Sequence, residues 1–235
     1  MFWDIQMEEE VRMNYVITDL EMNPIAKEYK AERKICRLEI IEIGAVIMDE
    51  NFLILGEFKT LVKPEYNECV EKKYETMTGI TTQMVGNAPK FTDAYKMFVD
   101  WCESYGSEYE VHAWSDSDYN QMLAEMKLKN YSKDAKGGSL NNWFDFQKEY
   151  MKKLGLERVI SLEKALDYAG IGFEGHMHDA LCDAKNTAEL FAIVRDEEKC
   201  NEVLKIVLEA LKPKKENLTL GDMIDFSALM EQLGE

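Results

Sequence analysis

Two carboxylates, Asp19 and Glu21, lie two positions apart at the end of the short apolar run NYVITDL, residues 14–20. Side chains two apart on a β-strand point to the same face of a sheet. An apolar strand seldom ends in two acids that face the same way unless a cation lies between them. Hard divalent cations prefer oxygen ligands, so the pair is a candidate metal site.

A third candidate carboxylate, Asp118, follows a second apolar run at residues 109–114. A strand followed by a helix suggests parallel pairing beside the first strand, which would bring Asp118 close to Asp19 and Glu21. Asp116 is interpreted instead as the cap or a first-turn acid of the helix that follows, where a negative charge is favourable. The same structural interpretation remains open for Asp118.

His178 and Asp183 lie five positions apart near the start of a helical pattern. Five positions correspond to about 140° of rotation on an α-helix, so both side chains can line one pocket only if His178 lies in the loop or first turn. Gly175 favours a loop at that point. His176 is a nearby competitor for any role in acid–base chemistry, whereas His112 is expected to be a strand residue with a local hydrogen bond.

The remaining pattern predicts the elements that would position these side chains. Residues 38–50 and 52–64 are apolar runs separated by a turn, which indicates an antiparallel hairpin. Helical spacing follows, first in two short pieces around Thr78-Gly79-Ile80 and then over residues 92–105, and residues 142–146 form a fifth candidate strand. We therefore expect an α/β fold with a mixed five-stranded sheet, whose first three strands form an antiparallel meander, and helices on both faces.

The composition narrows the class of protein. A net charge of -17 and a pI near 4.7 argue against a protein that coats nucleic acid nonspecifically, but a nuclease that binds divalent cations needs a cluster of acids. The five cysteines are widely spaced and predict reduced thiols rather than a disulfide framework. No signal peptide and no apolar run long enough for a membrane span is evident, so we expect a cytoplasmic protein without membrane contact.

Two segments invert the local charge. Residues 27–37 hold five basic and two acidic side chains, a net +3, and residues 127–153 hold seven lysines and three acids, a net +4. Both follow strands that carry candidate site residues. They are candidate tracks for a phosphate backbone, although ordinary solvated surface explains them equally well.

These segments together resemble the DEDDh exonucleases, the class that includes the proofreading subunit of bacterial DNA polymerase. The matching pieces are Asp19-Leu20-Glu21 followed by IIEIGAV, MTGIT at residues 77–81, Trp114-x-x-x-Asp118, and His178-x-x-x-x-Asp183 continued as AKNTA. The pattern is most similar to the branch of histone-mRNA and enhanced-RNAi exonucleases and bacterial sporulation-inhibitor relatives, over about residues 13–195. It departs from the family at Asn23, usually Thr or Cys, and at Ser115, usually Gly.

The resemblance implies an RNase H-like fold that binds two Mg²⁺ or Mn²⁺ ions. In that family pattern Asp19 would bridge both ions, Glu21 and Asp183 would hold the ion that binds the attacking water, and Asp118 would support the second. His178 would accept the proton of that water, since an imidazole with a pKa of about 6.5 is mostly free to act as a base at neutral pH. Substrate contacts are expected at Met22, Asn23, Thr78, Ile80 and Trp114.

The expected function is a metal-dependent 3′→5′ exonuclease that releases nucleoside monophosphates from single-stranded 3′ ends, with RNA favoured over DNA. The alternatives are a single-stranded DNA exonuclease of the proofreading or repair type and a catalytically silent binding protein on the same fold. We expect an N-terminal extension at residues 1–12, an exonuclease domain at 13–195, and a C-terminal helix and amphipathic tail at 196–235. The apolar face of residues 218–233 would pack on the domain or bind a protein partner.

Overall fold

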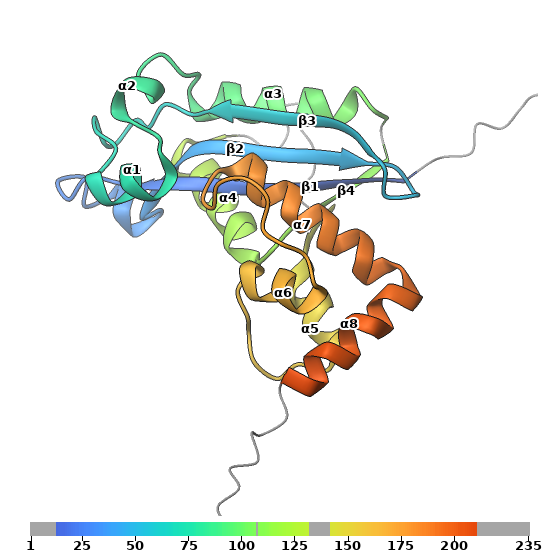
Figure 1. Cartoon of the computed structure of the whole chain (residues 1–235). Helices are drawn as coiled ribbons and strands as arrows, with labels where there is room; N and C mark the ends of the chain where they lie inside the picture. Colours follow the sequence, from blue (N-terminus) through green and yellow to red (C-terminus); the bar gives the residue numbers. More distant parts are fainter. Residues whose placement is uncertain (1–12, 107, 132–141, 211–235) are drawn as a thin grey trace, which may run out of the picture.

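A mixed five-stranded sheet forms the centre of the molecule. The computed structural model describes residues 13–106, 108–131 and 142–210, and in that part the strand order is β3-β2-β1-β4-β5 (Figure 1). β1, β2 and β3 are an antiparallel meander and β4 pairs in parallel with β1, as predicted. β5, whose direction was not predicted, pairs in parallel with β4. The strands are β1 (Asn14–Pro24), β2 (Leu38–Met48), β3 (Ile54–Leu61), β4 (Tyr109–Ala113) and β5 (Trp143–Asp145).

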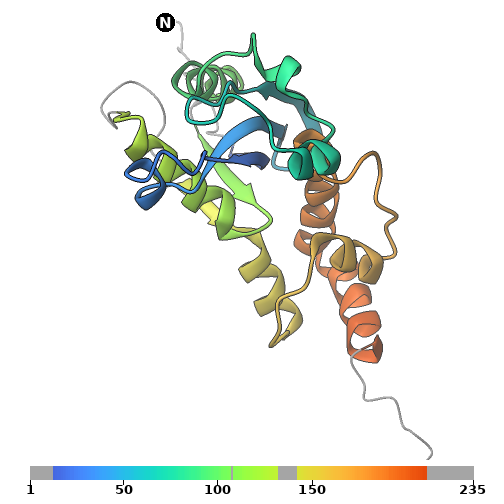
Figure 2. The ribbon, with the colours of Figure 1, turned by 90° about the vertical axis from the view of Figure 1, so that its left-hand side faces the viewer.

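Helices cover both faces of this sheet, which also confirms the expected layers (Figures 1 and 2). α3 and α4 pack on one face, and α7 packs on the other, where α5, α6 and α8 share its core. The helices are α1 (Lys72–Thr78), α2 (Thr82–Val85), α3 (Phe91–Glu103), α4 (Asp116–Leu128), α5 (Phe146–Leu154), α6 (Leu162–Ala169), α7 (Ala180–Arg195) and α8 (Glu197–Ala210), with a short 3-10 turn η1 (Glu32–Lys34) between β1 and β2.

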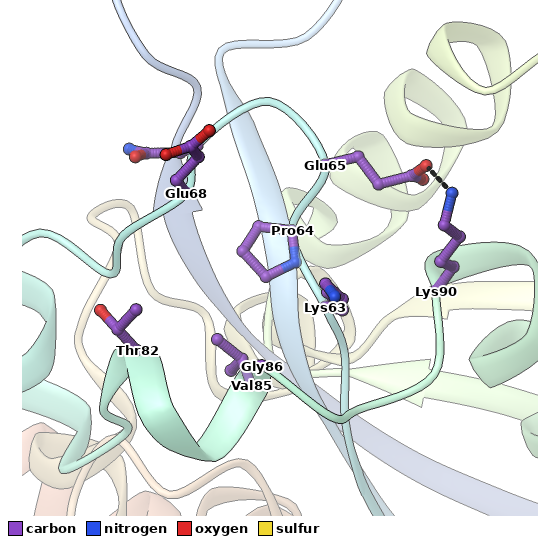
Figure 3. A pocket seen from close by; sticks show the side chains of 9 residues that line it. Lys63, Pro64, Glu65, Glu68, Thr82, Val85, Gly86 and Lys90 are labelled. Carbon is purple, nitrogen blue, oxygen red and sulfur yellow. Dashed lines mark hydrogen bonds and ion pairs between the residues drawn. The ribbon is translucent and has the colours of Figure 1, made fainter.

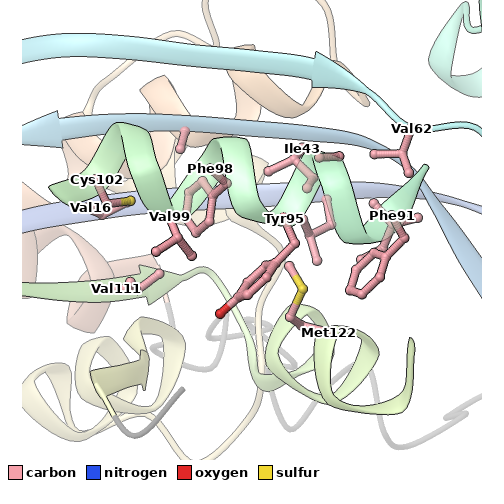
Figure 4. Packing of buried hydrophobic residues seen from close by; sticks show 14 of the residues in the cluster. Val16, Ile43, Val62, Phe91, Tyr95, Phe98, Val99, Cys102, Val111 and Met122 are labelled. Carbon is pink, nitrogen blue, oxygen red and sulfur yellow. The ribbon is translucent and has the colours of Figure 1, made fainter. Parts of the chain in front are cut away.

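The alternation of side chains along β1 determines where its acids point. Val16 and Leu20 are buried in the core beneath α3 and α4 (Figure 4). Ile17, one residue out of step with them, is buried in the core beneath α7. Because successive side chains on a strand alternate between faces, Asp19 and Glu21 continue the row of Ile17 and face α7.

The ends of the helices follow local signals, and Asp116 lies in the first turn of α4, one of the two positions predicted for it. Ser115, and not Asp116, caps α4, since its side chain accepts a hydrogen bond from the backbone N–H of Ser117. Asp116 is the first residue of the helix, where a negative charge favours the helix dipole. Ser161 caps α6, and Gly79 ends α1 in the left-handed conformation with φ 74°.

Both ends of the chain that the sequence analysis singled out, residues 1–12 and 218–233, lie outside the described residues. α8 buries Cys200, Val203 and Val207 in the same core as α7. The predicted boundary between the exonuclease domain and the C-terminal segment, at residue 195, stays a prediction, because α7 and α8 on its two sides share one core. Among the described helices, none combines the length and the apolar character that crossing a bilayer requires.

Candidate active site

Four carboxylates from one strand and from the first turns of two helices converge at one place. Asp19 and Glu21 come from β1, Asp118 from the first turn of α4, and Asp183 from the first turn of α7. Asp118 is only 6% exposed and lies close enough to β1 for the main chain at Leu20 to hydrogen-bond it. The structure thus brings together all four carboxylates that the sequence predicted as metal ligands.

Burial and the proximity of the four carboxylates raise their pKa values. Burial, followed by the charges of Asp118, Asp183 and Glu21, raises the pKa of Asp19 well above its usual range. Burial and the charge of Asp183 raise the pKa of Glu21 to about 8, and burial raises that of Asp118 to about 7, although backbone hydrogen bonds, one from Leu20, lower it. Burial also raises the pKa of Asp183. A bound cation would remove most of the cost of ionising all four.

The donor set fits divalent metal ions. Glu21, His178 and Asp183 each offer a ligand atom, and these atoms all lie within 4.8 Å of one another. Carboxylate oxygens are the donors that Mg²⁺ and Mn²⁺ prefer, and Asp19 and Asp118 add two more beside this group. We conclude that the site is a candidate centre for divalent metal ions.

His178 lies in the loop just before α7, as its role required. Its backbone is left-handed, with φ 63°, a conformation that costs a non-glycine residue energy and is retained where surrounding contacts enforce it. The contact here is a 3.0 Å hydrogen bond from the backbone N–H of His178 to Oδ2 of Asp183. The imidazole is half exposed, and its Nδ1 is 3.9 Å from Oε1 of Glu21. The ring therefore lies beside the carboxylates and remains open to solvent.

Close approach of α7 to the sheet depends on Gly44, the residue of β2 opposite Asp19. A Cβ atom at Gly44 would lie 2.2 Å from the backbone of Ala180 and Leu181 at the start of α7. No side chain fits in this space. Sequence reasoning assigned Gly44 only to a motif, because the partner of the glycine lies more than 130 residues further along the chain.

A partly buried ion cluster holds the same end of α7. Glu42 is 2% exposed and accepts a 3.0 Å hydrogen bond from the backbone N–H of Ala180. Lys59 of β3 forms ion pairs with Glu42 and with Asp179, whose side chain caps α7. The start of α7, which carries His178 and Asp183, is thus tied to two strands.

Asn186 fixes the loop that precedes His178, and sequence reasoning did not find it. It is 2% exposed, accepts a hydrogen bond from the backbone N–H of Glu174 and donates hydrogen bonds to the carbonyls of Glu174 and Cys182, at 2.7–2.9 Å. A Cβ atom at Gly175 would meet Sγ of Cys182 at 2.6 Å, so the loop also lies directly against the helix.

Three of the expected substrate contacts, Asn23, Thr78 and Ile80, have buried side chains, and their contact with a substrate stays a prediction. Asn23 is fully buried; its amide donates to the carbonyl of Cys69 and accepts from the backbone N–H of Glu71, so it fixes the entry to α1. Thr78 and Ile80 are also buried, and the hydroxyl of Thr78 is used within the turn. Both side chains therefore expose little surface.

Met22 and Trp114, the other two expected contacts, are partly buried. Met22 packs against the core beneath α3, and the ring of Trp114 lies edge-on to Phe146 and Tyr150. Each keeps some exposed surface, so contact with a substrate remains a prediction for both.

The two remaining histidines do not join the cluster. His176 is exposed, and its Nδ1 lies 3.1 Å from the carbonyl of Met177. His112 is buried in β4, bonds locally to Glu110 and stacks on Phe144, which agrees with its predicted role in a strand.

Two surface cavities lie away from the carboxylates. One, of about 440 Å³, is lined by Lys63, Glu68, Thr82 and Lys90 among others, and Lys90 is paired there with Glu65 (Figure 3). The other, of about 530 Å³, lies around residues 155–168. Neither is lined by any of the five candidate catalytic residues.

Comparison with known proteins places this site in a family. Residues 16–191 match the family model described as exonuclease, and the chain therefore belongs to that exonuclease family. Rat "3'-5' exoribonuclease 1" is 26% identical over 161 residues, which cover 65% of this chain and 45% of the relative. "ERI1 exoribonuclease 2" of Xenopus laevis is 30% identical over 173 residues, which cover 65% of this chain and 25% of that protein. The chain thus spans less than half the length of either relative.

Solved structures agree on the fold. The nuclease domain of 3'hExo, described as a DEDDh family member bound to rAMP, matches with a TM-score of 0.65 and 23% identity, covering 81% of this chain and 94% of that domain. The strand order and the two helical layers are therefore those of an RNase H-like exonuclease.

Proposed function

We propose that the protein is a metal-dependent 3′→5′ exonuclease that releases nucleoside 5′-monophosphates from single-stranded RNA ends. The observation that carries this proposal is the convergence of Asp19, Glu21, Asp118 and Asp183 with His178 beside them, in a chain that belongs to the exonuclease family. RNA is favoured over DNA because the relatives are named as exoribonucleases.

The four carboxylates would hold two divalent ions, Mg²⁺ or Mn²⁺. When bound, such ions supply an acidified water and neutralise charge on the scissile phosphate and the leaving oxygen. By resemblance to the family, Asp19, Glu21, Asp118 and Asp183 would hold these ions, and the charges of the other three carboxylates act on Asp19.

His178 is assigned as the general base. Its half-exposed ring accepts the proton of the attacking water, the new P–O bond forms, and the bond from phosphorus to the 3′ oxygen of the preceding nucleotide breaks. That oxygen then takes a proton from solvent. Nδ1 of His178 lies 3.9 Å from Oε1 of Glu21, and the hydrogen bond that the backbone N–H of His178 donates to Oδ2 of Asp183 holds the ring beside the carboxylates.

The test uses single-stranded RNA and DNA of one sequence, labelled at the 5′ end, with Mg²⁺, Mn²⁺ or EDTA. We expect a ladder that shortens from the 3′ end only with metal, faster on RNA than on DNA. Asp19→Asn should abolish it, and His178→Ala should slow it by about 10²–10⁴-fold, the usual contribution of a general base.

His176→Ala is the matched control, because it removes an exposed imidazole only two residues away and should leave the rate unchanged. Faster cleavage of DNA would replace the RNA assignment with the single-stranded DNA alternative. Absence of cleavage on both polymers, with divalent ions present, would favour a silent binding protein on this fold.

A further inference from the structure

The connection from β1 to β2 carries a cluster of unpaired positive charge. Residues 27–37 contain five basic and two acidic side chains in a chain whose net charge is -17. Lys27, Lys30, Lys34 and Arg37 are exposed, and within the described residues none of them forms an ion pair with a carboxylate. By contrast, the lysines at 59, 90, 129, 148 and 185 are all paired with carboxylates.

This connection is fixed on a defined frame. Ile25 and Cys36, near its two ends, are buried in a small core with Leu128 of α4. The backbone N–H of Ala26 donates to the carbonyl of Tyr66, and the guanidinium of Arg33 donates to the carbonyl of Ile25. The four free cations therefore project from an ordered segment, so less conformational entropy would be lost when they bind a ligand.

An aromatic surface adjoins the cations. Tyr29 is 37% exposed and lies edge-on to Tyr66, with ring centroids 5.3 Å apart. Exposed tyrosines among lysines can stack on the bases of a single strand while the lysines contact its phosphates, and this combination reads little sequence.

The position relative to the active site is also suitable. Lys27 lies only six positions after Glu21, a distance of at most about 22 Å along an extended chain. The connection packs beside α4, the helix whose first turn carries Asp118 (Figure 2). A short oligonucleotide whose 3′ end occupies the carboxylate cluster can therefore extend to this surface.

We propose that Lys27, Lys30, Lys34 and Arg37, together with Tyr29, bind the RNA strand on the 5′ side of the nucleotide being removed. This inference rests on the proposed exonuclease function. The four cations contact successive phosphates, and Tyr29 stacks on a base. In an otherwise acidic molecule, a local surface of this kind lets the polymer stay bound between successive cleavages.

The test compares two variants that remove the same charge. In the first, all four residues, Lys27, Lys30, Lys34 and Arg37, are replaced by Gln. In the matched control, three lysines and one arginine that are exposed outside both basic segments, Lys164, Lys199, Lys205 and Arg158, are replaced by Gln. KM and kcat are measured for a twelve-nucleotide RNA and for a dinucleotide, which is too short to reach the surface.

We expect the first variant to raise KM for the longer RNA by about tenfold or more, with dinucleotide cleavage and kcat within about twofold of wild type. The salt dependence of log(kcat/KM) should become shallower by about 2–3, since each phosphate contact on a single strand contributes a slope of about 0.7. Tyr29→Ala should raise KM for the longer RNA without changing that slope. The control variant should behave as wild type.

An equal effect of the two variants, or an equal loss on the dinucleotide, would overturn the proposal. Binding of fluorescent twelve-nucleotide RNA in EDTA, which needs no turnover, separates this inference from the proposed function. Unchanged binding of the RNA by the first variant would overturn the proposal that this surface binds the strand. Weakened binding in that variant alone, in a protein that cleaves no polymer, supports the surface and overturns the nuclease activity.

Discussion

Replacing Asn186 by Ala should lower kcat strongly while leaving the metal ligands in place. The change removes three hydrogen bonds, two of which hold the N–H and carbonyl of Glu174. Without them, the loop that ends at His178 loses its main attachment to α7, and the strained backbone of His178 is no longer fully enforced.

The magnitude follows from the hydrogen bonds to Glu174. A typical intramolecular hydrogen bond contributes about 0.5–1.5 kcal/mol net, so the two together favour the docked loop by about 1–3 kcal/mol. Losing this free energy lowers the ratio of docked to undocked loop by roughly 5- to 150-fold, so if the two forms are comparable in the wild-type protein, the population with His178 in position falls by roughly 3- to 80-fold. We therefore expect kcat to fall by about 3- to 80-fold, with KM nearly unchanged.

Steady-state kinetics on single-stranded RNA provide the assay, and Glu174→Ala is the matched control. The side chain of Glu174 is exposed while its backbone makes the hydrogen bonds, so this control keeps the clamp. A double-mutant cycle adds the decisive readout, because Asn186→Ala should cause little further loss of kcat in a His178→Ala background. Equal losses in both backgrounds, or kcat within threefold of wild type, would refute the reasoning; a urea titration shows whether the fold persists.

Three further predictions concern stability. In the folded protein the pKa values of Glu21 and Asp118 are about 8 and about 7, so in EDTA these groups bind more protons in the folded state than in the unfolded state. The Tm should therefore fall as the pH rises from 5.5 to 8.5. Differential scanning fluorimetry should show that Asp118→Asn or saturating Mg²⁺ reduces this fall. Gly44→Ala should destabilise the fold by about 1–3 kcal/mol in urea titrations and impair activity, because its Cβ overlaps backbone atoms of Ala180. Burial lowers the pKa of His112 to about 4, so stability should decline as pH falls from 6.5 to 4; His112→Phe should flatten that decline, and an unchanged acid midpoint would contradict it.

The sequence predicted those parts of the fold that depend on local order. The apolar run before Asp19 and the meander that follows indicated the sheet. The five-residue spacing to Asp183 left His178 in the loop or the first turn of the next helix, and the structure has it in the loop. The predicted cap positions were accurate to about one residue: Asp116 was a candidate cap of α4, and the cap in the structure is Ser115.

What the sequence could not show were contacts between distant segments. Asn23 was expected at the substrate because of the family resemblance, whereas its amide bonds backbone groups 46 and 48 residues away. Asn186 and Gly44 were hidden for a related reason. The amide of Asn186 acts on a loop twelve residues upstream, and the role of Gly44 depends on the backbone of α7.

The dispersion of the site along the chain affects how the activity appears during synthesis. Asp19 and Asp183, which share one charge cluster, are separated by 164 positions (183 minus 19). At about 5–20 residues per second, a ribosome needs roughly 10–30 s to add that stretch. Throughout this interval a nascent chain holds Asp19 and Glu21 without the helix that completes their surroundings. An enzyme that attacks RNA would thus stay inert beside its own message until translation has passed α7.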